Sequence, residues 1–332
     1  MTGSAAEVPE LPAQPDARPS GPASPTLDRP SPTLDRRPSP TLDRRPSPTL
    51  CGRPVATDRA LVMAIVNRTP DSFYDRGATF TDDAALAAVD RAVAEGADLV
   101  DIGGVKAGPG DLVDTAEEIR RVVPFVAAIR ERYPDVIISV DTWRSAVARR
   151  SVAEGADLIN DTWAGADPEL VDVAAELGAG IVCSHTGGAI PRTRPHRVRY
   201  TDIVEEVAAV VVGAAEDAAR RGVAADSILI DPTHDFGKNT HHGLELLRHV
   251  DVLVKSGWPV LMALSNKDFV GETLGVELAE RLEGTLAATA LSAAAGARVF
   301  RVHEVAATRR VVDMTAAIIG TRRPARTVRG LA

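Results

Sequence analysis

The sequence predicts an α/β fold, a (β/α)8 TIM barrel, preceded by a disordered low-complexity tail at the N-terminus. Three observations predict it: a proline-rich repeat at the start, eight short apolar runs after residue 58, and alanine-rich amphipathic stretches between the runs. Near-continuous apolar runs that alternate with helices are typical of a parallel sheet covered on both faces. Eight such units in roughly 270 residues suit a closed barrel. A doubly wound open sheet is the alternative.

Composition narrows the classes of function. The chain has 332 residues, of which 45% are hydrophobic and 25% charged, enough for a large core. The net charge of -8 gives no electrostatic reason to expect nucleic acid. No apolar run approaches the roughly 18 residues of a membrane span, and the start does not read as a signal peptide. Two cysteines fit a reducing compartment. We expect a cytoplasmic protein that binds neither nucleic acid nor membrane.

The N-terminal tail is repetitive. "SPTLDRP" begins at Ser24, "SPTLDRRP" follows twice, and "SPTL" ends at Leu50. A proline every few residues removes backbone donors and excludes helix. We predict that residues 1–57 form a disordered Pro-rich tail and that the folded domain spans 58–332. A dispensable extension and a partner-binding or phosphorylated tail are both open.

The predicted strands and helices follow in order. Two helical patterns run from Ala84 to Ala94 and from Val204 to Ala219. The near copies "AEGADLV" and "AEGADLI" each place a glycine at a helix end, where a left-handed backbone is required, and then start a strand. The eight predicted strands lie within 61–67, 98–104, 136–142, 157–163, 180–186, 227–233, 259–265 and 297–303.

Each strand ends in polar residues, and chemistry in such barrels sits at the carboxyl ends of the strands. An Asp at this place is often a helix N-cap, but all eight strands share the feature. Carboxylates suit a donor-rich heterocyclic edge, and Arg, His and Lys suit an anion. These residues are Asn67, Asp101, Asp141, Asn160 with Asp161, His185, Asp231, Ser265 with Lys267, and Arg301 with His303.

These strand ends belong to longer stretches that resemble the dihydropteroate synthases, and the pattern looks like a diverged second paralogue of that family. The stretches are "NRTPDSF" (67–73), "DIGG" (101–104), "SVDTWRSAVA" (139–148), "IND" (159–161), "DPTHDFGK" (231–238), "SNKDFVG" (265–271), "EGTLAA" (283–288) and "RVHEV" (301–305). The resemblance implies a (β/α)8 barrel. It also implies a transferase of folate biosynthesis that joins p-aminobenzoate to hydroxymethyl-dihydropterin pyrophosphate, with Mg2+, and releases pyrophosphate.

The resemblance also implies a pterin pocket. Asp141, Asn160 and Asp231 match pterin-holding positions, and Asp101 is a further binding candidate. A carboxylate accepts paired hydrogen bonds from an amino-pyrimidine edge, as it does from guanidinium. Lys267 matches the lysine beside the pterin ring.

The remaining roles concern the second substrate, the anion and the metal. Arg301 and His303 match the site that holds the pyrophosphate and, with Lys267, are the catalytic candidates. Asn67 matches the position near the metal, and Phe236 the aromatic wall for p-aminobenzoate or a sulfonamide-like ligand. The family is commonly dimeric, so a homodimer is expected.

The chain departs from the family at the mouth of the site. "DIGGVKAGPG" stands where the family usually reads "DIGGESTRPG", and "SNK" stands for "SRK", so Gly108 and Asn266 replace two arginines. In "DPTHDFGK", Thr233 and Asp235 replace glycines. Losing two charged hydrogen bonds to a pyrophosphate costs roughly 3–6 kcal/mol, or roughly 10² to 10⁴ in rate. New cations, such as Arg68, Arg76 and Lys106, are candidates for compensation.

The sequence therefore predicts a diverged dihydropteroate synthase homologue with a pterin and anion pocket and weak or no synthase activity. An active synthase is the alternative. Three further hypotheses stay open: a scaffold protein that uses the tail, an enzyme for another phosphorylated substrate, and a folate methyltransferase barrel.

Overall fold

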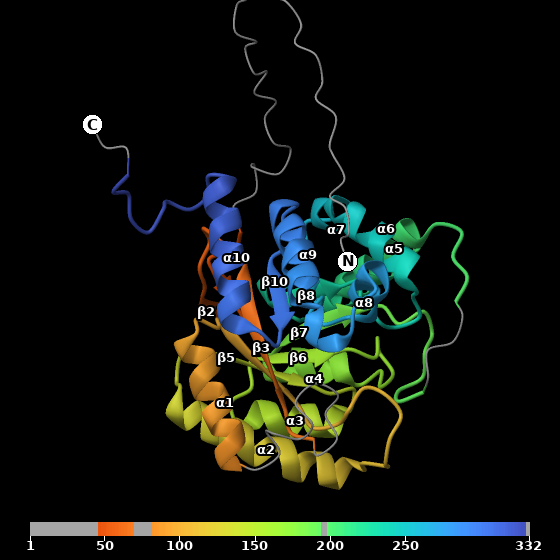
Figure 1. Cartoon of the computed structure of the whole chain (residues 1–332). Helices are drawn as coiled ribbons and strands as arrows, with labels where there is room; N and C mark the ends of the chain where they lie inside the picture. Colours follow the sequence, from red (N-terminus) through yellow and green to blue (C-terminus); the bar gives the residue numbers. More distant parts are fainter. Residues whose placement is uncertain (1–45, 70–81, 194–197, 330–332) are drawn as a thin grey trace, which may run out of the picture. The chain divides into compact units, whose positions relative to one another are not determined.

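A computed structural model describes residues 46–69, 82–193 and 198–329, all within one compact unit, Thr41–Ala332. Eight parallel strands curl into a barrel in the order β8-β7-β6-β5-β4-β3-β10-β9, with helices around them (Figure 1). A parallel bridge between Ile230 and Val260 joins the two ends of this order and closes the barrel. The predicted (β/α)8 barrel is confirmed.

Each predicted strand run contains one barrel strand. The ladders are in regular parallel register, with Asp101 opposite Ser139 and Asp141 opposite Asn160. The strands are β3 (Leu61–Asn67), β4 (Leu99–Gly103), β5 (Ile137–Asp141), β6 (Leu158–Asp161), β7 (Gly180–Ser184), β8 (Ile228–Asp231), β9 (Leu261–Met262) and β10 (Val299–Val302).

The helices follow the strands and include both predicted helical patterns. The glycines of the two "AEGAD" copies, Gly96 and Gly155, have φ of 95° and 106°, as the prediction of helix ends requires. The helices are α1 (Asp82–Ala94), α2 (Thr115–Arg132), α3 (Ser145–Ala153), α4 (Leu170–Leu177), α5 (Ile203–Arg220), α6 (Thr240–Arg248), α7 (Val250–Lys255), α8 (Asp268–Leu274), α9 (Leu282–Ala294) and α10 (Val305–Ile318). Among the described residues, none of the helices is long and apolar enough to cross a membrane.

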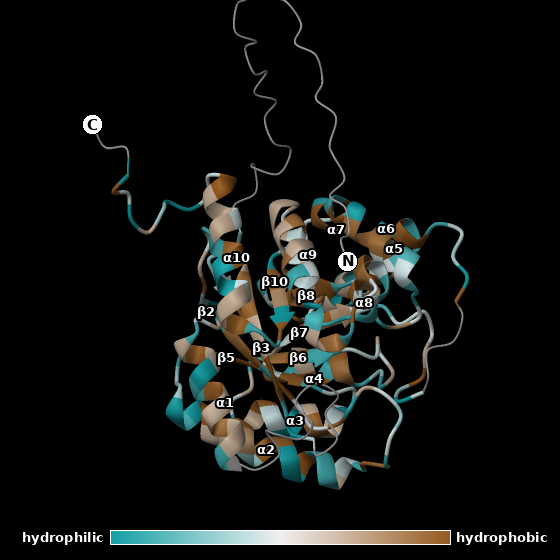
Figure 2. Ribbon diagram, viewed as in Figure 1, coloured by the Kyte–Doolittle hydropathy of each residue, from teal (hydrophilic) through white to brown (hydrophobic). Residues whose placement is uncertain are grey.

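The strands separate two apolar cores. Alternate residues such as Val62 and Val100 pack outward against the helices, whereas Leu61, Met63 and Leu99 fill the barrel. Figure 2 accordingly shows apolar residues along the strands, whereas the surrounding helices carry both hydrophilic and hydrophobic residues. In β4, the interior position two residues after Leu99 is Asp101. The side chains that fill the barrel therefore change from apolar to polar toward the carboxyl ends of the strands.

A small hairpin contacts the opposite, amino-terminal end of the barrel. Strands β1 (Thr49–Leu50) and β2 (Arg53–Pro54) pair across Cys51 and Gly52, both of which have positive φ. Leu50 is 4% exposed and belongs to the core cluster inside the barrel. The sequence prediction placed these residues in a disordered tail up to residue 57. Residues 1–45 lie outside the described residues, but from residue 46 the chain is part of the folded unit.

Candidate functional site

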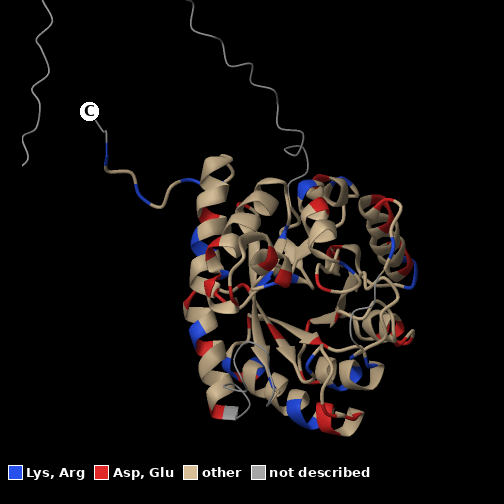
Figure 3. Cartoon of the chain, turned by 45° about the vertical axis from the view of Figure 1, so that its right-hand side comes forward, with Lys and Arg blue, Asp and Glu red and all other residues tan. Residues whose placement is uncertain are grey.

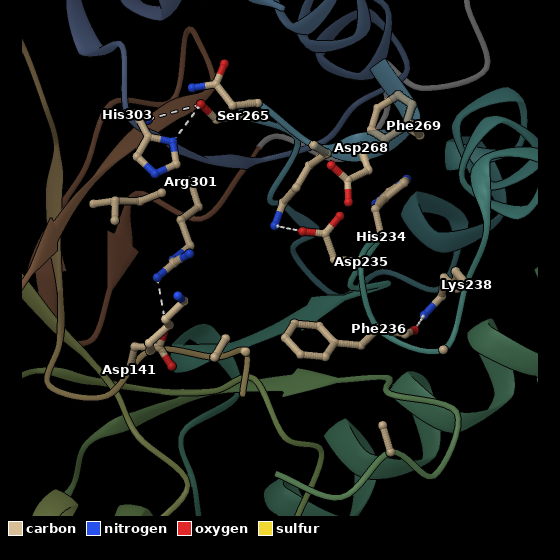
Figure 4. A pocket seen from close by; sticks show the side chains of 18 of the residues that line it. Asp141, His234, Asp235, Phe236, Lys238, Ser265, Asp268, Phe269, Arg301 and His303 are labelled. Carbon is tan, nitrogen blue, oxygen red and sulfur yellow. Dashed lines mark hydrogen bonds and ion pairs between the residues drawn. The ribbon is translucent and has the colours of Figure 1, made fainter. Parts of the chain in front are cut away.

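A cavity of about 580 Å³ opens at the carboxyl ends of the strands, within the size range of small-molecule sites. Its walls come from the loops after β3, β4, β7, β8, β9 and β10 (Figure 4). Acidic and basic residues are interspersed around these strand ends (Figure 3). Six predicted site residues line it: Asn67, Asp141, Phe236, Lys267, Arg301 and His303. The other three, Asp101, Asn160 and Asp231, are at most 1% exposed within the barrel.

Arg301 lies between two carboxylates. Its Nε donates to Asp101 Oδ2 at 2.6 Å, and its Nη2 donates to Asp141 Oδ2 at 2.8 Å (Figure 4). Asp101 also accepts from Ser139 Oγ at 2.5 Å and from Asn160 Nδ2 at 3.2 Å. Asp101 therefore positions Arg301 and Asn160, and the charge of Arg301 is balanced by its own chain.

Burial raises the pKa of two predicted site carboxyl groups, those of Asp141 and Asp231. It raises the pKa of Asp141 to about 7, against the opposing charge of Arg301. Burial likewise raises the pKa of Asp231 to about 6, where the Thr233 amide is the largest opposing influence. Each group can thus accept hydrogen bonds as a carboxylate or donate one as an acid near neutral pH.

His303 is held as a neutral imidazole. Its Nδ1 lies 3.0 Å from Ser265 Oγ, and its backbone amide donates to the same oxygen at 3.2 Å. Burial, then the charge of Arg301 and that of Lys267, lowers the pKa of His303 to about 3. A neutral His303 can donate a hydrogen bond to an anion but brings no charge.

Lys267 forms an ion pair with Asp235, from the loop after β8 (Figure 4). Asp235 is one of the residues that stand where the family has glycine. The second lysine of the site, Lys238, donates to the backbone oxygens of His185, Thr233 and Phe236, each at 3.0 Å. Burial lowers the pKa of Lys238 to about 7. Lys267 is therefore balanced by a carboxylate, and Lys238 holds the loop in place.

In the loop after β8, Thr233 adopts the left-handed backbone conformation that glycine favours. Thr233 has φ of 51°, which is unusual for a β-branched residue. Its amide donates to Asp231 Oδ1 at 2.7 Å, its hydroxyl donates to the Asp231 carbonyl at 3.1 Å, and the hydroxyl accepts from the His185 amide at 3.3 Å. These three bonds hold the strained residue. Asn266, with φ of 59°, is a residue that tolerates this region.

The loop after β4, whose sequence departs from that of the family, forms one wall of the cavity. Residues 105–109 line the cavity, and Lys106 is the cation they contribute. Arg192, from the loop after β7, donates to the carbonyl of Asp111 at 2.5 Å and so ties the two loops together. The same loop carries the basic run "PRTRPHRVR" (191–199), of which residues 194–197 lie outside the described residues.

Arg68, another cation that the sequence offered for compensation, does not reach the cavity. Arg68 is 6% exposed, its guanidinium lies 4.8 Å from the centre of the Phe125 ring, and its Nε donates to the Arg121 carbonyl at 3.4 Å. Arg68 therefore packs against α2 and does not line the cavity. Arg76 lies outside the described residues.

Several residues of the site escaped the sequence analysis. Trp163 packs edge-on against Phe236, with ring centres 4.6 Å apart, and so supports the ring that lines the cavity. Thr162 Oγ1 donates to Asp141 Oδ1 at 2.9 Å. Ser139 stands two residues before Asp141 in β5, so the period of two in a strand would have placed it inside the barrel. No pattern in the sequence indicated that His234 lies at the cavity.

Residues 63–303 match the family described as pterin binding enzyme. An "inactive dihydropteroate synthase 2" of Mycobacterium leprae is 71% identical over 282 residues, which cover 84% of this chain and 97% of that protein. A "dihydropteroate synthase" of Streptococcus pyogenes is 37% identical over 262 residues, covering 78% of this chain and 95% of that protein. A solved structure, Xanthomonas albilineans dihydropteroate synthase with 4-aminobenzoic acid, has a TM-score of 0.73 and 40% identity, and covers 81% of this chain and 96% of the solved chain.

Proposed function

The chain belongs to the pterin binding enzyme family, and on that premise we propose that it is a diverged dihydropteroate synthase homologue that binds a pterin-type molecule and has weak or no synthase activity. The observation that carries the proposal is the ion pair of Lys267 with Asp235, a carboxylate that stands where the family has glycine. Arg301 is bound by Asp101 and Asp141. The buried pterin candidates Asn160 and Asp231, in contrast, keep acceptor oxygens.

The acceptors suit the amino-pyrimidine edge of a pterin. Asn160 Oδ1 is buried and has no hydrogen-bond partner among the described residues. Asp231 offers a carboxylate at the end of β8, and both residues are at most 1% exposed. A buried acceptor without a partner costs about 1–3 kcal/mol, and a donor group of the ligand would recover that free energy.

The weak activity follows from the charges. A departing pyrophosphate needs donors aimed at the charge that develops on it. In this chain Arg301 and Lys267 must leave or share their carboxylates to supply them, and His303 stays neutral. Asn67 and Lys106 line the same cavity, so residual binding of pyrophosphate or phosphate is part of the proposal.

Mg2+ fits the site only together with a phosphorylated substrate. The described residues contain no group of three His, Cys, Asp or Glu that could hold a metal. Asn67 contributes an amide oxygen, and Mg2+ commonly combines few protein ligands with substrate phosphates and water. When bound in this way, Mg2+ would neutralise charge on the leaving pyrophosphate. Asn67 would hold it, and Asp101 would keep Arg301 oriented toward the same end of the cavity.

We also propose a homodimer in the cytoplasm. Apolar side chains of α9 and α10 are exposed, with Leu291 at 73%, Met314 at 61% and Ile318 at 71%, and a second copy of the chain would cover them. Cys51 and Cys183 are both free thiols, which favours a reducing compartment.

The first experiment measures dihydropteroate formation by the full chain with Mg2+, hydroxymethyl-dihydropterin pyrophosphate and p-aminobenzoate, alongside calorimetric binding of a pterin. Pterin binding with little or no turnover is the expected result. Turnover at the rate of an active synthase would overturn the proposed loss of activity and would favour the second candidate, an active enzyme that uses Lys106.

The pocket assignment is tested separately by Asp231→Asn. This variant should lose pterin binding, whereas Asp251→Asn, which removes a carboxylate from the exposed side of α7, should not. Unchanged affinity in Asp231→Asn would remove Asp231 from the pocket.

A further inference from the structure

Three aromatic side chains form a row that ends in the cavity. Phe236 lines the cavity, and its ring extends into it from the loop after β8 (Figure 4). Trp163, from the loop after β6, meets this ring edge-on, with ring centres 4.6 Å apart and the ring planes at 70°. Trp143, from the loop after β5, meets Trp163 in the same way at 6.3 Å and 77°. The loops after three strands therefore meet behind one wall of the cavity.

The loop after β6 holds Trp163 in place through Asp161, which is 4% exposed. The Oδ1 atom of Asp161 accepts from the Trp163 amide at 3.2 Å, and its Oδ2 accepts from the Gly165 amide at 2.6 Å. Between these residues Ala164 has φ of 54°, a left-handed conformation that costs a residue with a Cβ free energy. The sequence named Asp161 at a strand end without a role of its own. Its role in the structure is to hold the turn that presents Trp163.

The far end of the row is anchored by an ion pair. The guanidinium of Arg144 lies 4.6 Å from the centre of the Trp143 ring. It pairs with Glu118, whose side chain is fully buried, and it donates to the Val113 carbonyl at 2.7 Å. Trp163 is itself 3% exposed, so its ring is enclosed between two other rings and has little freedom to move.

The backbone and the ring of Phe236 are held by different partners. Its carbonyl accepts from Lys238 Nζ at 3.0 Å, and its amide donates to the Thr233 carbonyl at 3.3 Å. These bonds fix the main chain but leave the rotation about the Cα–Cβ bond free. Among the described residues, the aromatic contact of the Phe236 ring is the one with Trp163. The direction in which the ring points therefore depends on Trp163.

We propose that Trp163 is a positioning residue of the cavity, which holds the ring of Phe236 as a preformed wall and so sets the affinity for an aryl ligand. Trp163 stands behind the wall and is not one of the residues that line the cavity. A ring that is already fixed spares the ligand the free energy of ordering it. The inference rests on the proposed function, because it concerns the same cavity, but the pterin acceptors Asn160 and Asp231 are separate from it.

The test measures the Kd of p-aminobenzoate by calorimetry on the full chain, with and without saturating 6-hydroxymethylpterin. Trp163→Leu should raise this Kd by about threefold to tenfold, the range expected for ordering one side chain or losing one aromatic pair. Trp163→Phe, which keeps an aromatic edge, should restore most of the affinity. An unchanged Kd in the leucine variant, a phenylalanine variant that is no better, or no binding of p-aminobenzoate by the parent would overturn the inference.

The affinity for 6-hydroxymethylpterin alone is measured on the same proteins. We expect it to stay within about twofold of the parent in both Trp163 variants, because no pterin acceptor contacts the row. A loss as large as that for p-aminobenzoate would indicate general loosening of the site and would overturn the inference. Failure of the parent to bind the pterin counts against the proposed function instead, so the two failures are recorded independently.

A double-mutant cycle tests whether Trp163 acts through Phe236. Phe236→Leu removes the wall itself and should weaken p-aminobenzoate binding. If Trp163 acts through this ring, adding Trp163→Leu to the Phe236→Leu protein should change the Kd by less than about twofold. An equal loss in both backgrounds would show that Trp163 acts by another route and would overturn the inference.

The matched control is Trp258→Leu. Trp258 precedes β9 (Leu261–Met262) and so belongs to the opposite, amino-terminal end of the barrel. Its replacement should leave the Kd of p-aminobenzoate within about twofold of the parent, and a loss equal to that of Trp163→Leu would overturn the inference. Circular dichroism checks that each variant is folded.

Tryptophan fluorescence tests the contact without any ligand. The chain has three tryptophans, so Trp143→Phe with Trp258→Phe leaves Trp163 as the source of the emission. Adding Phe236→Leu should shift this emission to longer wavelength, because the ring that covers Trp163 is lost. An emission that does not change would mean that the two rings are not in contact in solution, and the inference would fall.

Discussion

Pterin affinity should fall as the pH is lowered through the titration of Asp231. Burial raises the pKa of this carboxyl from its ordinary value near 3.8 to about 6. A ligand edge made of donors needs the ionised form, whose population falls about tenfold between pH 8 and pH 5 for a pKa of 6. The expected result is a Kd that is about tenfold higher at pH 5 than at pH 8. The increase would be larger if Asp141, with a pKa of about 7, also accepts a hydrogen bond from the ligand.

The same shift predicts an opposite effect on the stability of the free protein. The folded state keeps the proton of Asp231 up to a higher pH than the unfolded state does. This contribution is present below about pH 4 and is lost as the pH rises through about 6, by roughly 3 kcal/mol. The free energy of unfolding of the parent, minus that of Asp231→Asn, should decrease by this amount over that window.

Both effects are measured with the same two proteins. Calorimetry at pH 8, 7, 6 and 5 gives the affinities, and urea denaturation gives the stabilities. A pterin affinity that is flat over this range, in a parent protein that stays folded, would refute the assignment of Asp231 as an ionised acceptor for the ligand.

Three further predictions concern stability and rate. Leu50→Ala should lower the free energy of unfolding by about 2–5 kcal/mol, measured by chemical denaturation. Leu112→Ala, at a side chain 90% exposed, should change it by less than about 0.5 kcal/mol. Thr233→Gly should be more stable than Thr233→Ala by about 1 kcal/mol, because alanine keeps the left-handed strain and glycine does not; the reverse order in thermal melts would contradict the strain. Gly108→Arg with Asn266→Arg should raise any synthase rate, while Asn266→Arg costs about 1 kcal/mol of stability at its left-handed backbone. If a product-formation assay shows no gain, the weak activity would be assigned to Asp235 and not to the two missing arginines.

The sequence was most informative where local rules decide the structure. Apolar runs and the glycines at helix ends predicted all eight strands, because a parallel strand is buried on both faces and Gly96 and Gly155 have to adopt positive φ. Active sites of such barrels lie at the carboxyl ends of the strands. This rule correctly predicted one shared cavity for Asp141, Lys267, Arg301 and His303.

Contacts between distant residues could not be predicted in this way. Nothing in the spacing of Lys267 and Asp235 indicates that they pair, or that Arg301 binds both Asp101 and Asp141, because those contacts depend on side-chain directions at the top of the barrel. The same holds for Arg68, whose position next to a strand end suggested the cavity but whose side chain packs on Phe125.

The hairpin at the foot of the barrel is the last of four nearly identical segments. The copies that begin at Ser31 and Ser39 share with it Ser-Pro-Thr-Leu, two variable residues and Arg-Pro. They carry Asp-Arg where the folded copy has Cys51 and Gly52, and a two-residue hairpin with both turn residues at positive φ disfavours arginine by about 1–2 kcal/mol. The turn residues, together with the packing of Cys51, Val55 and Ala56 against the core cluster inside the barrel, therefore favour this segment over its duplicates at this end of the barrel.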